Sequence, residues 1–206
     1  MLSPGEQPRS QPLSTRQLVW SFLVLLILAA VWFVQRRNIE EYRRYFMIDN
    51  PSVTFAFTDL SEEWSEKTLR ERFPGVPVSC HPYQGPLPVD RACALDVRSH
   101  NGVPTLFIAF FFSKGYLDHV SVNVPSWHHS RAYKNLVGTQ GPADDSQFLP
   151  YAGVRLHGWR LADGAGLFLN RDSPFNPLSW NAIYWQSASA CAKAGCFKSE
   201  APRNPF

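Results

Sequence analysis

The sequence lacks the short motifs that carry most motif-defined chemistries. It contains no G-x-S-x-G nucleophile elbow, no H-E-x-x-H zinc helix, no G-x-x-x-x-G-K-[ST] phosphate loop and no EF-hand loop. The stretch "GAGLFL" at Gly164 has two glycines of the dinucleotide fingerprint, but it lacks the third and lies in an expected hairpin turn. These absences exclude the enzyme classes that such motifs define. We expect neither a catalytic residue set, nor a metal, nor a cofactor.

An excess of one charge is also missing. The 206 residues carry 20 Lys and Arg against 17 Asp and Glu, a net charge of +3. Much of that surplus lies in arginines that follow an apolar run near the N-terminus. No basic stripe interleaved with aromatic residues is present in the rest of the chain. Nucleic acid is therefore not expected as a partner.

The histidines give weak candidates for a metal or acid–base site. His128 and His129 are adjacent on an expected helix, where neighbouring side chains point about 100° apart, so they make poor joint ligands. His119 follows Asp118 on an expected strand, where successive side chains face opposite sides. We therefore expect no contact between Asp118 and His119.

The longest feature present is the apolar run "LVWSFLVLLILAAVWFV", from Leu18 to Val34. It has no charged residue, and as a helix it would extend roughly 25 Å, the lower end of what a bilayer core needs. A cleaved signal peptide would have a shorter run followed by an A-x-A site, and Leu28 is too large for that pattern. The run predicts one uncleaved transmembrane helix over residues 18–35. Its interface residues are expected to be Trp20, Trp32, Arg36 and Arg37.

The orientation of this helix is the point on which two signals disagree. More arginines follow the run than precede it, which by the positive-inside rule would place the domain in the cytoplasm. The four cysteines favour the opposite side, because paired cysteines without a metal motif are typical of an oxidising compartment. Long domains also translocate largely regardless of flanking charge. We favour a single-pass protein of the cell inner membrane with its C-terminal domain on the exported, periplasmic side.

The cysteines form two pairs that are close in sequence: Cys80 with Cys93, and Cys191 with Cys196. Neither pair has C-x-x-C spacing, so zinc binding is not indicated. Four cysteines allow three pairings, and we predict the one that joins nearest neighbours. A nucleophilic Cys80 beside His81 remains an alternative that a disulfide would remove.

The rest of the chain predicts an α+β protein. After the transmembrane helix we expect a single domain of antiparallel meander sheets packed with two helices, with a tandem repeat of one helix and three strands as a possible arrangement. The expected helices begin at Ser61 and Ser126, and a strand is expected over residues 52–58. The predicted segments are a disordered tail (1–17), the transmembrane helix (18–35), an Arg-rich juxtamembrane stalk (36–50), the globular domain (51–197) and a C-terminal tail (198–206).

Three functional hypotheses follow. The leading one is a non-enzymatic, membrane-anchored accessory or assembly subunit, whose exported domain binds a protein complex of the cell envelope. It rests on the anchor, the missing catalytic motifs and an aromatic content of 14%. The alternative is a membrane-tethered envelope hydrolase whose His and Asp residues meet only on folding. A third is a glycan- or lipid-binding module that uses exposed tryptophans.

The topology is the first testable prediction. If the domain is exported, protease added to spheroplasts is expected to digest the chain beyond about Tyr45 while the span stays in the membrane. The measurement is an immunoblot against the C-terminal end, before and after lysis of the inner membrane. Protection of the domain until lysis would place it in the cytoplasm.

Overall fold

A computed structural model describes residues 14–144, 148–149 and 154–197. The chain divides into two compact units, Met1–Glu40 and Glu41–Phe206. Most of the predicted N-terminal tail and the whole predicted C-terminal tail lie outside the described residues.

The first helix, α1, runs from Thr15 to Met47 and is long and apolar enough to cross a membrane. It starts at a reciprocal cap, in which Gln17 N donates to Ser14 Oγ and Ser14 N donates to Gln17 Oε1. The helix covers the predicted span and continues through most of the predicted stalk. Its last residues, from Glu41, belong to the second unit.

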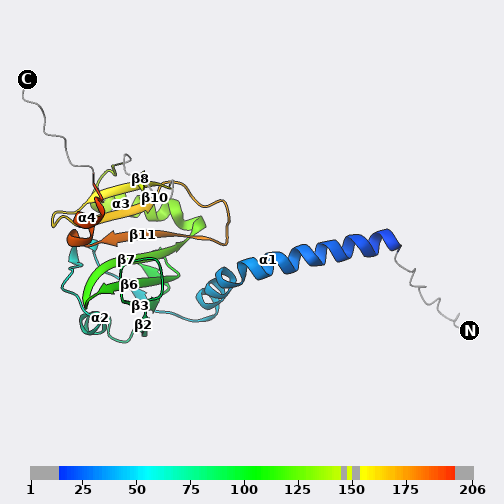
Figure 1. Cartoon of the computed structure of the whole chain (residues 1–206), viewed down its shortest axis with the longest axis horizontal. Coiled ribbons are helices and arrows are strands. Elements are labelled where there is room, and N and C mark those ends of the chain that lie inside the picture. The colour runs from blue at the N-terminus through cyan, green and yellow to red at the C-terminus, as the bar shows by residue number, and fades with distance from the viewer. Residues whose placement is uncertain (1–13, 145–147, 150–153, 198–206) are drawn as a thin grey trace, which may run out of the picture. The chain divides into compact units, whose positions relative to one another are not determined.

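The second unit is built on one antiparallel sheet (Figure 1). The order of its strands is β2-β3-β6-β7-β11-β10-β9-β8. The strands are β2 (Val78–Pro82), β3 (Arg91–Asp96), β6 (Phe107–Ser113), β7 (Tyr116–Pro125), β8 (Phe148–Leu149), β9 (Val154–Arg160), β10 (Gly166–Asn170) and β11 (Trp180–Gln186). The predicted α+β class, with an N-terminal apolar helix and antiparallel meanders, is confirmed.

Two similar halves make up this sheet. Helix α2 (Glu66–Arg72) precedes β2, β3, β6 and β7, and helix α3 (His129–Gln140) precedes β8, β9, β10 and β11. Each half therefore supplies one helix and four strands, one strand more than the repeat considered from the sequence. The last strands of the halves, β7 and β11, pair at the centre over seven residues, from Pro125 opposite Trp180 to His119 opposite Gln186.

A small second sheet interrupts the first half. Its strands β1 (Ser52–Val53), β4 (Ser99–His100) and β5 (Val103–Pro104) surround the expected Asn-Gly turn, where Asn101 and Gly102 have φ of 50° and 74°. The strand predicted over residues 52–58 is wrong beyond Val53. Phe55 instead bonds the Asn101 side chain, whose Oδ1 accepts from Phe55 N and whose Nδ2 donates to Phe55 O. The 3₁₀ helix η1 (Phe57–Asp59) follows.

Both predicted helix starts are wrong by a few residues. The N-cap of α2 is Ser65, whose Oγ accepts from Thr68 N at 3.3 Å, while Ser61 forms a local turn with Glu63. Ser126 does not cap α3, because its hydroxyl donates to Pro177 O at 2.9 Å. A 3₁₀ turn, η2 (Ser126–His128), therefore precedes α3. In both cases a second polar residue or a tertiary partner competes with the local cap.

A further short helix, α4 (Ala188–Ala194), was not predicted. Its signals are present in the sequence, since Ser187 caps it through Ala190 N and Gly195 ends it with φ of 65°. Seven residues are too few to show a hydrophobic period, so this helix gives no periodic signal in the sequence.

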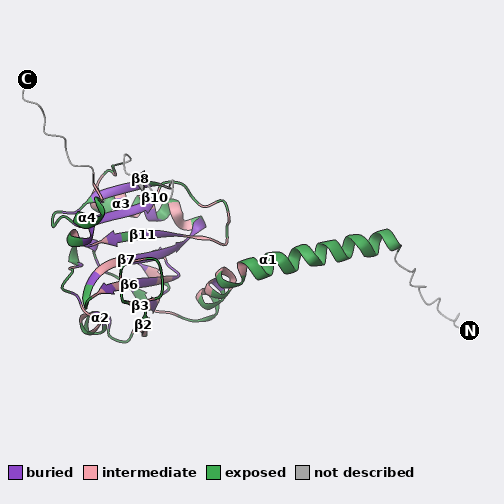
Figure 2. Cartoon of the chain, in the orientation of Figure 1, coloured by how far each residue is buried: buried purple, intermediate pink, exposed green. Residues whose placement is uncertain are grey.

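The main core lies on one face of the sheet, between the strands and a layer made of α2, α3 and the small sheet. Leu69 of α2 and Leu136 of α3 are buried there with Phe110, Val122 and Trp185 from the central strands. The opposite face carries a separate, smaller cluster in which α4 packs on β9 and β10 through Cys191, Leu156 and Phe168. Figure 2 shows the central strands as the most buried part of the second unit. The two faces are therefore covered unequally.

His100 is a buried histidine of this core and gives the second prediction. Its ring lies 4.3 Å from that of Phe55, and its Nε2 donates to Phe55 O. Burial lowers the pKa of His100 to about 4, against an ordinary 6.5. Above pH 6.5 the group is neutral in both states. Below pH 6.5 the imidazole of His100 is protonated in the unfolded chain but stays neutral in the folded chain. The free energy of unfolding therefore falls as the pH drops from 6.5 to about 4.

This loss is expected to reach about 3 kcal/mol. Urea unfolding of the protein in mild detergent at pH 7 and pH 4.5 measures it. The His100→Gln variant keeps a neutral donor and is expected to lose less stability on acidification than the parent. If the free energy of unfolding has the same pH dependence in the parent protein and in the His100→Gln variant, His100 is not the source of that dependence.

Candidate functional site

The most distinctive surface is the sheet face opposite the main core. On β6 the side chains of Ile108, Phe110 and Phe112 enter the core, so Phe107, Ala109 and Phe111 point to the other side. We call the central part of that side the uncovered face. It consists of Phe107, Ala109 and Phe111 on β6, His119, Ser121 and Asn123 on β7, and Trp180, Ala182, Tyr184 and Gln186 on β11. Among the described residues, α4 is the only helix that packs on this side, and it covers β9 and β10.

The middle of the uncovered face is made of small, neutral residues that are themselves buried, since Ala109, Ser121, Asn123 and Ala182 are at most 9% exposed. Strand register places Tyr184 opposite Ser121, Ser121 opposite Ala109, and Ala109 opposite Ala94 of β3. The polar groups among them are satisfied locally, since Ser121 Oγ donates to Asn123 Oδ1 and Asn123 Nδ2 donates to Ser121 O. This row carries no charge, and Tyr184 is its exposed member.

Aromatic rings surround that middle. Phe107 contacts Trp180 edge-on at 5.8 Å, and Phe111 contacts Tyr83 in the same way at 5.4 Å. Tyr184 is 41% exposed, although burial of its hydroxyl raises the pKa above the usual value. Exposed or half-buried aromatic rings around a neutral centre are the composition found at the core of protein interfaces. The side chains of β11 alternate, with Trp180 and Tyr184 on this side of the sheet and Trp185 on the other.

The expected separation of Asp118 and His119 is wrong. His119 Nδ1 lies 2.5 Å from Asp118 Oδ2. The cause is a β-bulge, where the register shifts between Phe111 and Phe112 and leaves β7 with an extra residue. Leu117 and Val120 both enter the core, so the two residues between them lie together on the uncovered face. Period-two reasoning misses such a pair because a bulge has no reliable signal in one sequence.

This pair is the best candidate for acid–base chemistry. Burial lowers the pKa of the His119 imidazole, and the Asp118 carboxylate opposes that shift through charge and hydrogen bonding. His119 is therefore neutral at pH 7 and is oriented by a carboxylate, as a general base would be. Among the described hydrogen bonds, however, none joins His119 to a Ser, Thr or Cys side chain. The pair lacks the nucleophile that a triad requires.

The adjacent histidines at the η2–α3 junction are not arranged as joint metal ligands. Asn181 Nδ2 donates to His129 Nδ1 at 2.9 Å, and His129 Nε2 donates to Arg171 O at 3.3 Å. Both ring nitrogens of His129 are thus engaged in holding α3 to β11 and the loop that precedes it. Burial is also the largest reason why the pKa of His128 and that of His129 are lowered.

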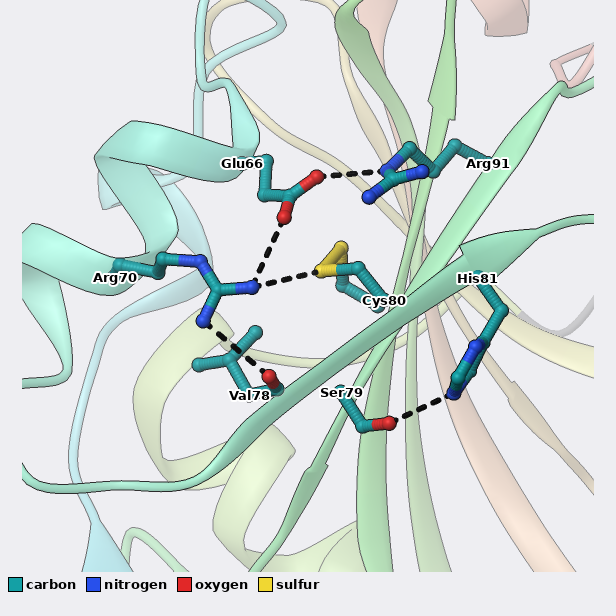
Figure 3. A network of polar contacts seen from close by, with 8 residues as sticks. Glu66, Arg70, Val78, Ser79, Cys80, His81 and Arg91 are labelled. Carbon is teal, nitrogen blue, oxygen red and sulfur yellow. Dashed lines mark hydrogen bonds and ion pairs between the residues drawn. A yellow bond between two sulfur atoms is a disulfide. The ribbon is translucent and has the colours of Figure 1, made fainter.

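One group of three possible ligands lies between α2 and the sheet. Glu66, Cys80 and Cys93 bring their ligand atoms within 4.8 Å of one another. The sulfurs are bonded to each other, with a Cα–Cα distance of 4.0 Å across paired strands β2 and β3. Arg91 Nε at 2.7 Å and Arg70 Nη2 at 2.9 Å occupy the two Glu66 oxygens and lower the pKa of that carboxyl (Figure 3). The group is a structural clip rather than a cation site.

The proposed Cys80 nucleophile also fails on geometry. Cys80 carries no free thiol, and the His81 ring bonds Ser79 Oγ at 2.8 Å rather than the sulfur (Figure 3). The second disulfide joins Cys191 to Cys196 at a Cα–Cα distance of 4.9 Å. It closes the C-terminal turn of α4, where Cys196 N donates to Cys191 O. The described cysteines are all paired.

The expected membrane-interface residues lie on the part of α1 that belongs to the first unit. Trp20 and Trp32 are each 61% exposed, and the Arg36 guanidinium lies over the ring of Phe33 at 5.0 Å. Arg37 lies one residue further along the helix. Their role at a membrane interface stays a prediction.

Comparisons of the chain with protein-family models, with curated proteins and with solved structures found no match.

The Asp118–His119 pair gives the third prediction. In the Asp118→Asn variant the attraction of the carboxylate is lost while burial remains, so the pKa of His119 is expected to fall further. The imidazole resonance of His119, followed by NMR across a pH titration, measures the change. An unchanged or higher pKa would show that Asp118 does not control the ring.

Proposed function

We propose that this protein is a single-pass, non-enzymatic accessory or assembly subunit of a cell-envelope protein complex. Helix α1 anchors it in the cell inner membrane, the second unit lies on the periplasmic side, and the uncovered face binds the partner protein. The observation that carries the proposal is the unequal covering of the sheet. An eight-stranded sheet buries one face under two helices and leaves aromatic rings on the central strands of the other.

The chemistry of the uncovered face supports a protein partner. Its small central side chains are neutral and buried, so the groups that a partner would contact are the rings of Phe107, Phe111 and Tyr184. Covering those rings would release water from apolar area, which is the main gain in protein association. A charged small molecule would find no opposite charge in the middle of this surface.

Support for the exported side comes from the two disulfides. Each clips an exposed segment: Cys80–Cys93 ties the edge strand β2 to β3, and Cys191–Cys196 closes the end of α4. Disulfides of this structural kind form and persist in oxidising compartments. They outweigh the arginines after the span, because those arginines precede a long domain.

A membrane-tethered hydrolase is the second candidate, and the Asp118–His119 pair is the observation that favours it. The pair lies on the same uncovered face, so a partner or a substrate would approach it from one side. It ranks second because the described residues supply no nucleophile bonded to His119. Glycan or lipid binding by this face is the third candidate.

Co-purification from mild detergent tests the leading proposal. The parent protein is expected to bring down a stoichiometric envelope protein. The Tyr184→Arg variant places a charge among the aromatic rings of the uncovered face and is expected to lose the partner at least about tenfold, the effect of roughly 1.4 kcal/mol.

Tyr116→Arg is the matched control. Tyr116 is an exposed tyrosine at the start of β7, on the same side of the sheet but beyond the residues that define the uncovered face, and its variant is expected to retain the partner. A parent protein that purifies without any partner, or a partner lost equally from both variants, would contradict the proposal. Turnover of an ester or amide substrate that Asp118→Asn abolishes would favour the hydrolase instead.

A further inference from the structure

A second group of exposed apolar side chains lies where the end of α1 packs on the domain. We call it the basal patch and define it by Phe46, Met47, Ile48, Trp127 and Phe175. Their exposed fractions are 69%, 79%, 53%, 52% and 106%. Apart from these five and the residues of the predicted span, the large apolar side chains that are exposed in the described chain are Tyr116 and Tyr184. Exposed apolar side chains therefore concentrate in the basal patch.

Tyr42 contacts two members of the basal patch and bonds the loop that carries a third. It is 5% exposed, its ring stacks on Trp127 at 5.0 Å and on Phe46 at 6.5 Å, and burial raises its pKa to about 12. Its hydroxyl donates to Ser179 O in the loop that joins β10 to β11. The last turns of α1, η2 and this loop thus meet around one side chain.

The loop from residue 171 to 179 is braced and yet presents Phe175 fully to solvent. Ser126 Oγ donates to Pro177 O at 2.9 Å, and Ser173 Oγ donates to Ser126 O at 3.4 Å. At its two ends, Arg171 N donates to Arg155 O, and Tyr42 bonds Ser179 O. Because this loop is fixed by hydrogen bonds, the Phe175 ring keeps its whole apolar area exposed to water. Such an arrangement is stabilised when the ring is buried in a second phase or a partner.

The chain itself indicates which partner that is. Residues 41–48 follow the predicted span after residues 36–40 of the same helix, so connectivity keeps the basal patch within reach of the bilayer surface. Aromatic side chains are enriched at the level of the lipid headgroups, and Arg44, an exposed residue of the last turn of α1, suits lipid phosphates. A protein partner would not need to lie at this end of the domain.

We infer that the basal patch rests on the lipid bilayer, with Phe175 and Trp127 inserted at the headgroup boundary, so that the domain is held against the membrane surface at a second point besides its anchor. This inference is independent of the partner proposed for the uncovered face. It gives the domain a preferred orientation on the membrane, because α1 and the patch together fix two points of attachment.

Lipid-borne quenchers test it with the full chain in vesicles of mixed zwitterionic and anionic phospholipid. The Phe175→Cys variant offers a single thiol for a fluorescent label, because the described native cysteines are all in disulfides. Nitroxide groups on the upper acyl chains are expected to remove most of the emission of a label at residue 175. The Tyr116→Cys variant, whose native ring is 61% exposed but lies outside the patch, is the control and is expected to keep its emission.

Strong quenching at residue 175 with none at residue 116 supports the inference. Equal quenching at both positions, or at neither, overturns it, because the domain would then have no preferred face toward lipid. The Trp127→Ser variant, labelled at 175, provides a second measurement and is expected to show weaker quenching. The label at residue 175 could instead stay unquenched by lipid nitroxides in vesicles and also be protected from aqueous iodide in native membranes. That result would assign the basal patch to a protein partner and overturn the lipid assignment.

Discussion

The pairing of β7 with β11 is the interaction on which the rest of the domain depends. These strands end the two halves of the chain, and their seven paired residues turn two four-stranded meanders into one sheet. Val120 and Val122 of β7 then share a core with Ile183 and Trp185 of β11, under helices that come from both halves. In an isolated half, β7 or β11 would become an unpaired edge strand, and part of this shared core would be exposed. We therefore expect neither half to be stable by itself.

The same pairing accounts for the two surfaces. Because α2, α3 and the small sheet all lie on one face, the hydrophobic residues of the central strands are concentrated there, and the other face receives small, polar and aromatic side chains. The bulge at Asp118 adds a polar pair to that face without disturbing the core. At another place on the domain, Tyr42 gathers the end of α1 and the loop after β10 into the basal patch. We propose that the uncovered face binds a partner protein, and we infer that the basal patch meets lipid.

Much of the fold could be predicted from the sequence, because the signals concerned are local. The apolar run, the alternation of β11 and the Asn101-Gly102 turn each depend on a few neighbouring residues. What could not be predicted depends on contacts between distant segments. Ser126 lost its role as a cap to a bond with Pro177, and the strand after Val53 was replaced by bonds from Asn101 to Phe55. Neither partner can be found from sequence spacing.

The candidate sites also depend on contacts between distant segments rather than on local signals. Asp118 and His119 meet because of a bulge, and the basal patch joins residues from three separate segments, so period and spacing rules could not find either.

Site-specific photo-crosslinking in living cells tests the central claim, that the domain meets its partner through the uncovered face, most directly. A photoreactive phenylalanine analogue replaces Tyr184 in one strain and Lys134, an exposed residue of α3 on the opposite, helix-covered side, in another. The account predicts a discrete cross-linked protein from position 184 and none from position 134. A cross-link from position 134 alone would contradict it.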